Sequence, residues 1–341
     1  ADHFVFRLKV RENDSLVFEV EAEETRQVIG EARDSKLRLA FVTNQIAGFW
    51  NVAKSGCLDA QRDLGVEVVV VMPPQPSVAI QKEMVKELLA DGIDGIAISP
   101  LDADNQTAWL NEIAAQVPLI THDADAPESK RRVYLGMDNY KAGRMCGELV
   151  KKALPNGGGV MLFIGNLRLN IAKQRRQGVI DELFGRPVPE SHDKIAHDPV
   201  EGVLDSGKYK ILGTAVTGFA QARQMADDAI ADYPDMKAMV GLFEYNLPAC
   251  YQALKQAGKL GKIKLVGFDE NDVTLQGIKD GTVAGTIVQN PYEYGYQSVK
   301  ILKDILEGKQ VQDFIDILPR KITKENVDAY WTDLKARKTG N

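Results

Sequence analysis

From residue 36 onward, short apolar runs alternate with longer segments that carry apolar residues at helical spacing. The runs are continuous and rich in β-branched residues, which is typical of parallel strands covered on both faces. They span Leu37 to Thr43, Val66 to Met72, Ile93 to Ser99, Val117 to Thr121, Val160 to Ile164, Tyr209 to Val216, Ala238 to Leu242, Ile263 to Phe268 and Val283 to Val288. We expect a strand at each of them.

The segments between the runs predict helices, among them 77–90, 102–115, 139–154 and 218–231. Gly65, Gly92 and Gly258 stand where helices should end, because glycine accepts the left-handed backbone that closes a helix. Strand and helix in alternation throughout predict an α/β fold with doubly wound parallel sheets.

The alternation is interrupted once, near the middle of the chain. A short strand around 134–138 leads into Asn139, a good helix cap, and the rhythm restarts after the glycines at 157–159. We therefore expect two similar lobes and not one wide sheet. Residues 1–35 differ: 3–10 and 16–22 alternate apolar and polar residues, which predicts an amphipathic hairpin with a turn at 12–15. A tail or an added extension is the alternative for this segment.

Composition narrows the class of protein. The 341 residues are 44% hydrophobic and 26% charged, which is typical of a globular chain. The net charge of −6 does not favour binding to phosphate backbones, which are themselves negative. We therefore expect no nucleic-acid partner. No apolar run approaches the length of a membrane span.

Cysteine and histidine offer little for disulfides or metals. Cys57, Cys146 and Cys250 are too few and too far apart for a disulfide framework or a metal site, and we expect buried thiols. The 4 histidines show no metal-ligand spacing. We expect neither a metal nor a cofactor.

In open parallel sheets, ligands bind just beyond the carboxyl ends of the strands. The residues that follow the predicted strands are small polar groups, aromatics and two aspartates, with no phosphate-binding glycine motif at 157–159 or 277–285. They include Thr43, Phe49, Trp50, Ser99, Asp123, Thr217, Phe243, Asp269 and Gln289. Carboxylates accept sugar hydroxyls, and aromatic rings pack against the C–H faces of sugar rings.

Each candidate also has a plainer interpretation. Asp123 and Asp269 could be turn or cap residues, and Phe49 and Trp50 could belong to the core. Helical residues 173–176 (KQRR) would by default form a solvated face.

An enzyme is not supported by the motifs. No GxSxG elbow occurs. His122 and Asp123 are adjacent on a strand and point to opposite faces, so they cannot form a catalytic dyad. We expect a protein without catalytic residues.

The chain resembles the periplasmic sugar-binding proteins of ABC importers, of the ribose-binding type, over about residues 36–335. The resemblance rests on an ordered series of segments: FVTNQIAGFW, ADGIDGIAISPLDADN, VPLITHDAD, YLGMDNYKAG, KQRRQG, KLVGFDENDV, GTVAGTIVQNPYEYG and ITKENVD.

The resemblance implies the type I periplasmic-binding-protein fold, in which two α/β lobes joined by a three-strand hinge close on one ligand. Its topology places crossings near Asp138, Asn290 and Leu318. The implied organisation is an N-terminal extension over 1–35, lobe 1 over 36–138 plus 290–317, and lobe 2 over 139–289 plus 318–341.

The resemblance also carries site residues. It implies that Thr43 and Ser99 are polar contacts, that Phe49 and Trp50 sandwich the sugar, and that Asp123 and Asp269 take its hydroxyls. It further implies a basic contact from Lys173 or Arg175 and an amide donor at Gln289.

The chain departs from the ribose binders at four positions. Ala47 and Phe243 replace polar amides, Ala124 replaces an arginine, and Thr217 replaces an aromatic residue. The resemblance therefore implies a ligand that is less polar than ribose or shaped differently, still contacted from positions 217 and 243.

The function implied is that of a monomeric solute-binding receptor for a monosaccharide or related polyol, which delivers it to an ABC transporter permease by hinge closure. A periplasmic or extracellular location follows, with a lipid anchor as one option and any signal peptide already removed. A sugar sensor subunit for a receptor kinase or chemoreceptor is the alternative. A LacI-type effector core fits poorly, because residues 1–35 are predicted as strands and not as a DNA-binding helix-turn-helix.

Overall fold

The structure is a computed structural model that describes residues 2–12, 15–26, 36–167, 169–191 and 194–339. The chain divides into two compact units, Ala1–Lys36 and Leu37–Asn341. In the first unit, β1 (Asp2–Glu12) pairs antiparallel with β2 (Ser15–Arg26). The turn expected at 12–15 includes residues 13 and 14, which lie outside the described residues.

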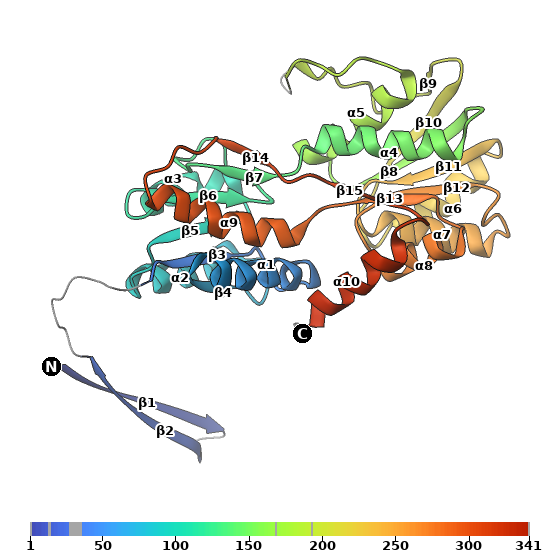
Figure 1. Ribbon diagram of the computed structural model, residues 1–341. Helices are drawn as coiled ribbons and strands as arrows, with labels where there is room; N and C mark the ends of the chain where they lie inside the picture. The colour runs from blue at the N-terminus through green and yellow to red at the C-terminus, as the bar shows by residue number, and fades with distance from the viewer. Residues whose placement is uncertain (1, 13–14, 27–35, 168, 192–193, 340–341) are drawn as a thin grey trace. The chain divides into compact units, whose positions relative to one another are not determined.

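The second unit contains two sheets, each with its own helices (Figure 1). Lobe 1 has a parallel six-stranded sheet in the order β14-β7-β6-β5-β3-β4. Its strands are β3 (Arg38–Val42), β4 (Glu67–Val71), β5 (Gly95–Ile98), β6 (Leu119–His122), β7 (Tyr134–Gly136) and β14 (Phe314–Asp316). Its helices are α1 (Gly48–Leu64), α2 (Val78–Ala90), α3 (Ala103–Ala114) and α9 (Pro291–Leu306).

Lobe 2 has a seven-stranded sheet in the order β15-β13-β12-β11-β8-β10-β9, whose two edge strands run antiparallel to their neighbours. Its strands are β8 (Gly158–Ile164), β9 (Leu204–Asp205), β10 (Tyr209–Val216), β11 (Met236–Gly241), β12 (Lys264–Phe268), β13 (Gly285–Val288) and β15 (Arg320–Ile322). Its helices are α4 (Asn139–Ala153), α5 (Asn170–Phe184), α6 (Ala222–Asp232), α7 (Asn246–Gln256), α8 (Asp272–Asp280) and α10 (Val327–Thr339).

The strands of lobe 1 are mostly apolar because helices cover both faces of the sheet. Leu39 and Phe41 of β3 pack in the cluster formed with α1 and α9, whereas Ala40 and Val42 pack in the cluster with α2 and α3. All four are at most 1% exposed. Alternate side chains of a strand point to opposite faces, so an apolar run without polar alternation is what a doubly covered sheet requires. The predicted α/β class and two doubly wound lobes are thereby confirmed.

The chain passes between the two sheets three times, as Figure 1 shows. The passages lie between β7 and α4, between β13 and α9, and between β14 and β15. Each lobe is therefore built from segments that are separate in the sequence. The residue boundaries predicted for the lobes stay predictions, since sheet membership fixes the elements only.

The first passage corrects one predicted cap. Asp138, and not Asn139, is the cap of α4, because its side chain accepts the Lys141 N–H at 3.0 Å. Aspartate and asparagine cap helices about equally well, and aspartate adds a favourable charge at the helix N-terminus. Asn139 is the first helical residue, and its amide donates to the Met137 carbonyl at 3.0 Å. The helix expected from 218 also begins later, at Ala222.

Three predicted helix ends and the state of the thiols are confirmed. Gly65, Gly92 and Gly258 follow α1, α2 and α7 with φ of 67°, 74° and 65°. Cys57, Cys146 and Cys250 are buried and unpaired, and burial raises the pKa of each thiol. Within the described residues, no helix is both long and apolar enough to cross a bilayer.

Candidate functional site

Asp123 and Asp269 occupy corresponding places in the two lobes, each directly after a central strand (β6 and β12). Both have φ of 60°, and they are the non-glycine residues with positive φ among those described. Aspartate tolerates this left-handed conformation better than most residues. Each backbone carbonyl accepts a hydroxyl from the neighbouring strand: Tyr134 donates to Asp123 at 2.9 Å, and Thr286 donates to Asp269 at 2.8 Å. The same backbone conformation and the same kind of hydrogen bond therefore position both carboxyl groups.

Arg175 of α5 lies beside Asp269. The guanidinium is 3.7 Å from Asp269 Oδ2, donates to Asn139 Oδ1 at 2.9 Å, and donates to the Leu242 carbonyl at 3.1 Å. The residue is only 4% exposed. Its neighbour Arg176 is 3% exposed and donates to backbone carbonyls. The solvated face expected by default for these arginines is therefore wrong, because the guanidinium groups find buried acceptors.

Two aromatic rings flank the Arg175 guanidinium, with Phe268 at 4.6 Å and Phe243 at 5.4 Å from the guanidinium carbon. A planar guanidinium stacks favourably on such rings, which fixes its orientation while its N–H groups remain in plane. The rings and the two carbonyl-type acceptors hold Arg175 in one position next to Asp269.

Close helix packing places Arg175 at this position. A Cβ on Gly178 of α5 would lie 2.2 Å from the Tyr140 carbonyl oxygen, and a Cβ on Gly143 of α4 would lie 2.3 Å from the Arg175 carbonyl oxygen. Only glycine permits this approach of α4 and α5.

Asp123 in lobe 1 is under the influence of charges from lobe 2. Its Oδ2 accepts the Ser99 hydroxyl at 3.3 Å. Burial raises the pKa of Asp123 to about 6; Ser99 and the Arg175 charge oppose this shift, and the Asp269 charge adds to it. The two aspartates and the arginine therefore form one electrostatic group across the two lobes.

Gln289 and Tyr294 complete this group from the second passage between the sheets and from α9. Gln289 Nε2 donates to Asp269 Oδ1 at 3.1 Å, and the Tyr294 hydroxyl donates to Gln289 Oε1 at 3.3 Å. Burial and the nearby Asp123 charge raise the pKa of the Tyr294 hydroxyl. We call Asp123, Arg175, Asp269, Gln289 and Tyr294 the interlobe site.

Thr43 and Ser99 are fully buried at the ends of β3 and β5. The Thr43 hydroxyl donates to the Gln45 carbonyl at 2.9 Å, and Gln81 donates to the carbonyls of Thr43 and Ser99 at 3.0 and 2.9 Å. Ser99 thus touches the interlobe site through Asp123, whereas Thr43 holds the loop that follows β3.

Trp50 is 2% exposed and lies in the core of lobe 1. Its indole N–H donates to Asn44 Oδ1 at 3.0 Å, and its ring packs edge-on against His122 at 5.4 Å. Phe49 is partly exposed, 4.8 Å from the Trp50 ring and 6.1 Å from the Tyr294 ring. Of the predicted aromatic pair, Phe49 is the member next to the interlobe site.

His122 points into the core, away from Asp123. Its ring stacks on Phe41 at 4.1 Å, and its Nε2 lies 3.2 Å from the Val42 carbonyl oxygen. Burial lowers the pKa of His122 to about 3, so the ring is neutral. Within the described residues, no group of three or more His, Cys, Asp or Glu side chains is arranged to hold a metal ion.

Sequence reasoning missed two aromatic residues beyond the strands of lobe 2. The Tyr245 hydroxyl donates to the Thr217 carbonyl at 2.8 Å, and its ring lies between Phe243 at 6.1 Å and Phe219 at 6.0 Å. Phe219 is 81% exposed. An aromatic residue three positions after the end of a predicted strand, at Val216 and at Leu242, was the available sign. The Thr217 hydroxyl donates to the Gly218 carbonyl at 2.9 Å.

Lys173 does not join the interlobe contacts described here. It is partly buried on α5. Burial lowers the pKa of His197, and the Lys173 charge lowers it further. The structure thus brings Arg175, and not Lys173, beside Asp269.

Comparison with known proteins identifies the family of this chain. The family described as "Periplasmic binding protein domain" matches residues 39–310. This chain belongs to the periplasmic binding protein family. The ribose import binding protein RbsB of Bacillus subtilis is 26% identical over 272 residues, covering 78% of this chain and 80% of the relative.

Solved structures agree on the type I fold of this periplasmic binding protein. AraP, an arabinose-binding protein from Geobacillus stearothermophilus, superposes with a TM-score of 0.76 at 21% identity, covering 87% of this chain and 99% of that one. A chain of the XylFII-LytSN complex superposes with a TM-score of 0.66 at 22% identity, covering 85% and 99%. The predicted family and fold are confirmed.

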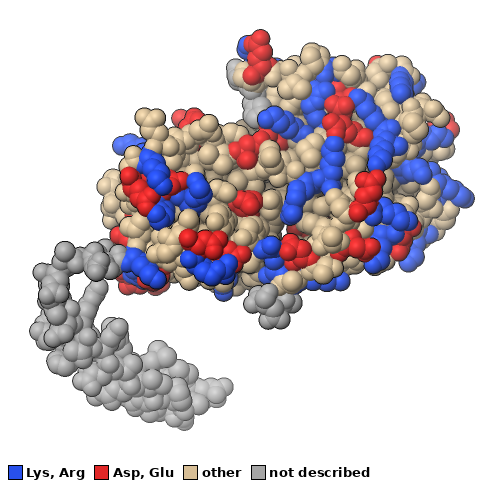
Figure 2. Space-filling view, viewed as in Figure 1, with Lys and Arg blue, Asp and Glu red and all other residues tan. Residues whose placement is uncertain are grey.

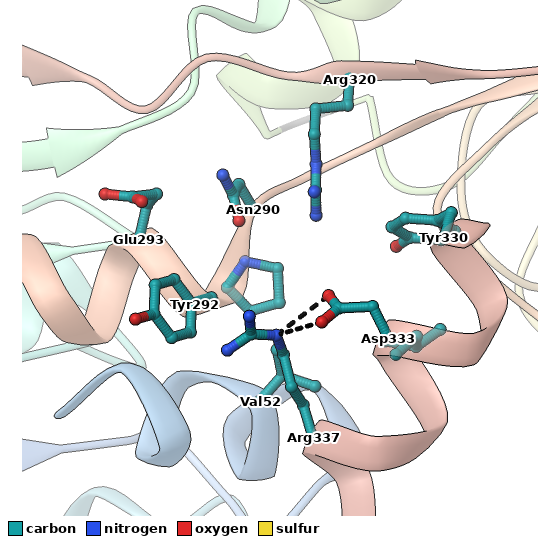
Figure 3. Close-up of a pocket in the computed structure, with 10 residues that line it drawn as sticks. Val52, Asn290, Tyr292, Glu293, Arg320, Tyr330, Asp333 and Arg337 are labelled. Carbon is teal, nitrogen blue, oxygen red and sulfur yellow. Dashed lines mark hydrogen bonds and ion pairs between the residues drawn. The ribbon is translucent and has the colours of Figure 1, made fainter. Parts of the chain in front are cut away.

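This periplasmic binding protein has a cavity of about 230 Å³ next to the passages between its lobes (Figure 3). Arg337 of α10 stacks on Tyr292 of α9 at 4.1 Å, and its Nε pairs with Asp333 at 2.9 Å. The Tyr292 hydroxyl donates to Asp59 of α1 at 2.8 Å. We call Arg337, Tyr292 and Asp59 the α10 clasp, because it joins lobe 2 to lobe 1.

Proposed function

We propose that this protein is a solute-binding receptor for a monosaccharide or related polyol, which it holds at the interlobe site. The observation that carries the proposal is the convergence of Asp123 from lobe 1 with Asp269 and Arg175 from lobe 2. Carboxylates accept two hydroxyl groups at once, and a guanidinium donates to ring or hydroxyl oxygens. The relatives named for ribose and arabinose support a sugar as the ligand class.

The other proposed contacts follow from the same geometry. Gln289 donates from its amide, Ser99 supports Asp123, and Phe49 and Phe243 pack on the C–H faces of the ring. Three buried residues support the site without contacting the ligand: Trp50, Thr43 and Thr217. Each bonds to a neighbouring side chain or carbonyl of its own loop. Catalysis is no part of the proposal, because family members are binding proteins.

Ligand binding is proposed to close the two lobes about their three connecting segments. Contacts to both lobes exist only when the lobes approach, so the ligand favours the closed arrangement. A shift from mostly open to mostly closed requires about 5 kcal/mol of differential binding. We propose that the closed form, a monomer located in the periplasm or outside the cell, then docks on the permease of an ABC importer.

The charge distribution on the displayed face does not suit nucleic acid. Figure 2 shows basic and acidic side chains interspersed on the face displayed. A phosphate backbone needs a basic groove or stripe instead.

Isothermal titration against pentoses, hexoses and sugar alcohols tests the ligand class. We expect saturable heat with at least one of them at a stoichiometry of about one. Absence of heat with the whole panel, for protein shown to be folded by circular dichroism, would end the sugar-receptor proposal.

A sensor subunit is the second candidate, because a chain of the XylFII-LytSN complex shares the fold and is seen with a second protein. In that case the ligand-bound form docks on a receptor kinase or chemoreceptor. Pull-down with the ligand-loaded protein, using membranes from its own host, separates a permease from a receptor.

A further inference from the structure

The charges of the interlobe site do not balance. Two carboxylates, Asp123 and Asp269, face one guanidinium, Arg175. With both carboxylates ionised, the group carries a net charge of −1. A charge imbalance inside a largely buried site is costly unless a bound group corrects it.

The imbalance is located at Asp123. Asp269 is paired with Arg175 at 3.7 Å and accepts Gln289 at 3.1 Å. The Asp123 carboxylate accepts one hydrogen bond from a neutral group, the Ser99 hydroxyl at 3.3 Å. No cationic side chain among the described residues lies within ion-pair distance of Asp123.

Apart from Arg175, the described groups around Asp123 supply no cation. Tyr134 of β7 and Tyr294 of α9 are neutral phenols, and burial raises the pKa of both hydroxyls. His122 is neutral and faces the core. Arg131 is engaged elsewhere: it bonds the two oxygens of Asp125 at 2.7 and 2.8 Å and the Asp313 carbonyl at 3.2 Å.

We propose that the ligand carries an ammonium group that pairs with Asp123, which makes it an amino sugar or an amino-substituted cyclic polyol. This inference rests on the proposed function and specifies its substrate class. The ammonium supplies the missing positive charge and up to three N–H donors. The partly exposed Phe49 ring, 6.1 Å from the Tyr294 ring, offers an aromatic face next to the same place.

A neutral sugar would leave the net charge of the site at −1. Its hydroxyls could donate to Asp123, but neutral donors stabilise a buried carboxylate less than a cation does. The comparison of a hydroxyl with an ammonium at one position of the same ring therefore tests the inference directly.

The test titrates matched pairs into the full chain at pH 7.5 and low ionic strength. The pairs are D-glucose and D-glucosamine, D-galactose and D-galactosamine, and scyllo-inositol and scyllo-inosamine. N-acetylglucosamine and N-acetylgalactosamine serve as neutral controls. We expect at least one amine to bind about tenfold or more tightly than its hydroxyl counterpart, and added salt to reduce this ratio.

The variant Asp123→Asn should weaken binding generally and bring the amine-to-hydroxyl ratio close to one. The exposed Asp91, at the C-terminal cap of α2, provides the matched control Asp91→Asn, which removes the same charge from the same lobe and should keep the ratio.

The outcomes separate the two proposals. Neutral sugars that bind as tightly as their amines, or a ratio that survives in Asp123→Asn, overturn the inference and leave the sugar-receptor function standing. Failure of every compound to bind the folded protein overturns both.

Discussion

At the scale of residues, the structure explains why two aspartates stand out. Each follows a central strand, adopts φ of 60°, and has its backbone carbonyl bound by a hydroxyl of the next strand. The backbone strain is a cost that a turn-forming glycine would avoid. Aspartate at both positions supplies the pair of carboxylates that the proposed binding site requires.

The substitution Asp269→Ala should reduce affinity for the ligand by at least about 2 kcal/mol, because it leaves Arg175 and the ligand hydroxyls without their acceptor. Isothermal titration measures the change. The control Asp280→Ala removes an exposed carboxylate at the end of α8 and should bind as the wild type does. Unchanged affinity in Asp269→Ala would place the site elsewhere.

We expect Asp123 to make ligand affinity depend on pH. Its pKa is about 6 in the ligand-free protein, and a ligand that donates to the carboxylate lowers this pKa. Affinity should therefore fall as pH drops below about 6, by up to tenfold per pH unit. Titrations between pH 5 and 8 measure it, and Asp123→Asn should flatten the profile. A wild-type profile that is equally flat contradicts the assignment.

The Asp123 carboxyl also makes the stability of the ligand-free protein depend on pH. The direction is opposite to that expected for ligand affinity. The folded pKa of Asp123 lies above the ordinary value of 3.8, so the folded state binds more protons than the unfolded state between pH 4 and 6. The contribution of Asp123 to stability should therefore decrease as pH rises through this window. Thermal unfolding of wild type against Asp123→Asn measures the difference.

At the scale of elements, the sequence predicts the strands well. It does not predict how the helices pack against one another. The apolar runs match β3 to β6, β8 and β10 to β13, because a parallel strand covered on both faces is apolar at most of its positions. The two- and three-residue strands β9, β14 and β15 have no such run. The burial of Arg175 was not predictable, since it depends on acceptors supplied by Asn139 and Leu242, far away in the sequence.

The glycine contact between α4 and α5 should control the position of Arg175. In Gly178→Ala, the new methyl group would lie 2.2 Å from the Tyr140 carbonyl, so α5 must move away from α4. We expect lower thermal stability, by about 1–3 kcal/mol, together with weaker ligand binding. The control Asn170→Ala, at the exposed first residue of the same helix, should change neither. A Gly178→Ala variant with wild-type affinity would show that Arg175 is positioned by other contacts.

At the scale of the whole molecule, the two lobes are interleaved in the sequence. The chain enters lobe 2 after β7, returns to lobe 1 with α9, and leaves again between β14 and β15. The sequence indicated two lobes through the interruption near residue 138, and the family resemblance implied the crossings. The α10 clasp was not predictable, because Arg337, Tyr292 and Asp59 come from three distant helices.

The clasp should hold α10 and couple the lobes. In Arg337→Ala, α10 loses its stacking on Tyr292 and its pairing with Asp333. We expect faster hydrogen exchange of the α10 amides and a loss of stability of about 1 kcal/mol. Thr332→Ala, at an exposed position of the same helix, provides the comparison. Wild-type exchange in Arg337→Ala would show that apolar packing alone holds the helix.

The central claim is that the ligand binds between Asp123 of lobe 1 and Asp269 and Arg175 of lobe 2. A crystal structure of the protein with the compound that binds most tightly in titration tests it most directly. We expect one ligand in contact with all three side chains and with Phe49. A ligand bound in the cavity beside the α10 clasp, or contacting one lobe only, would contradict the account.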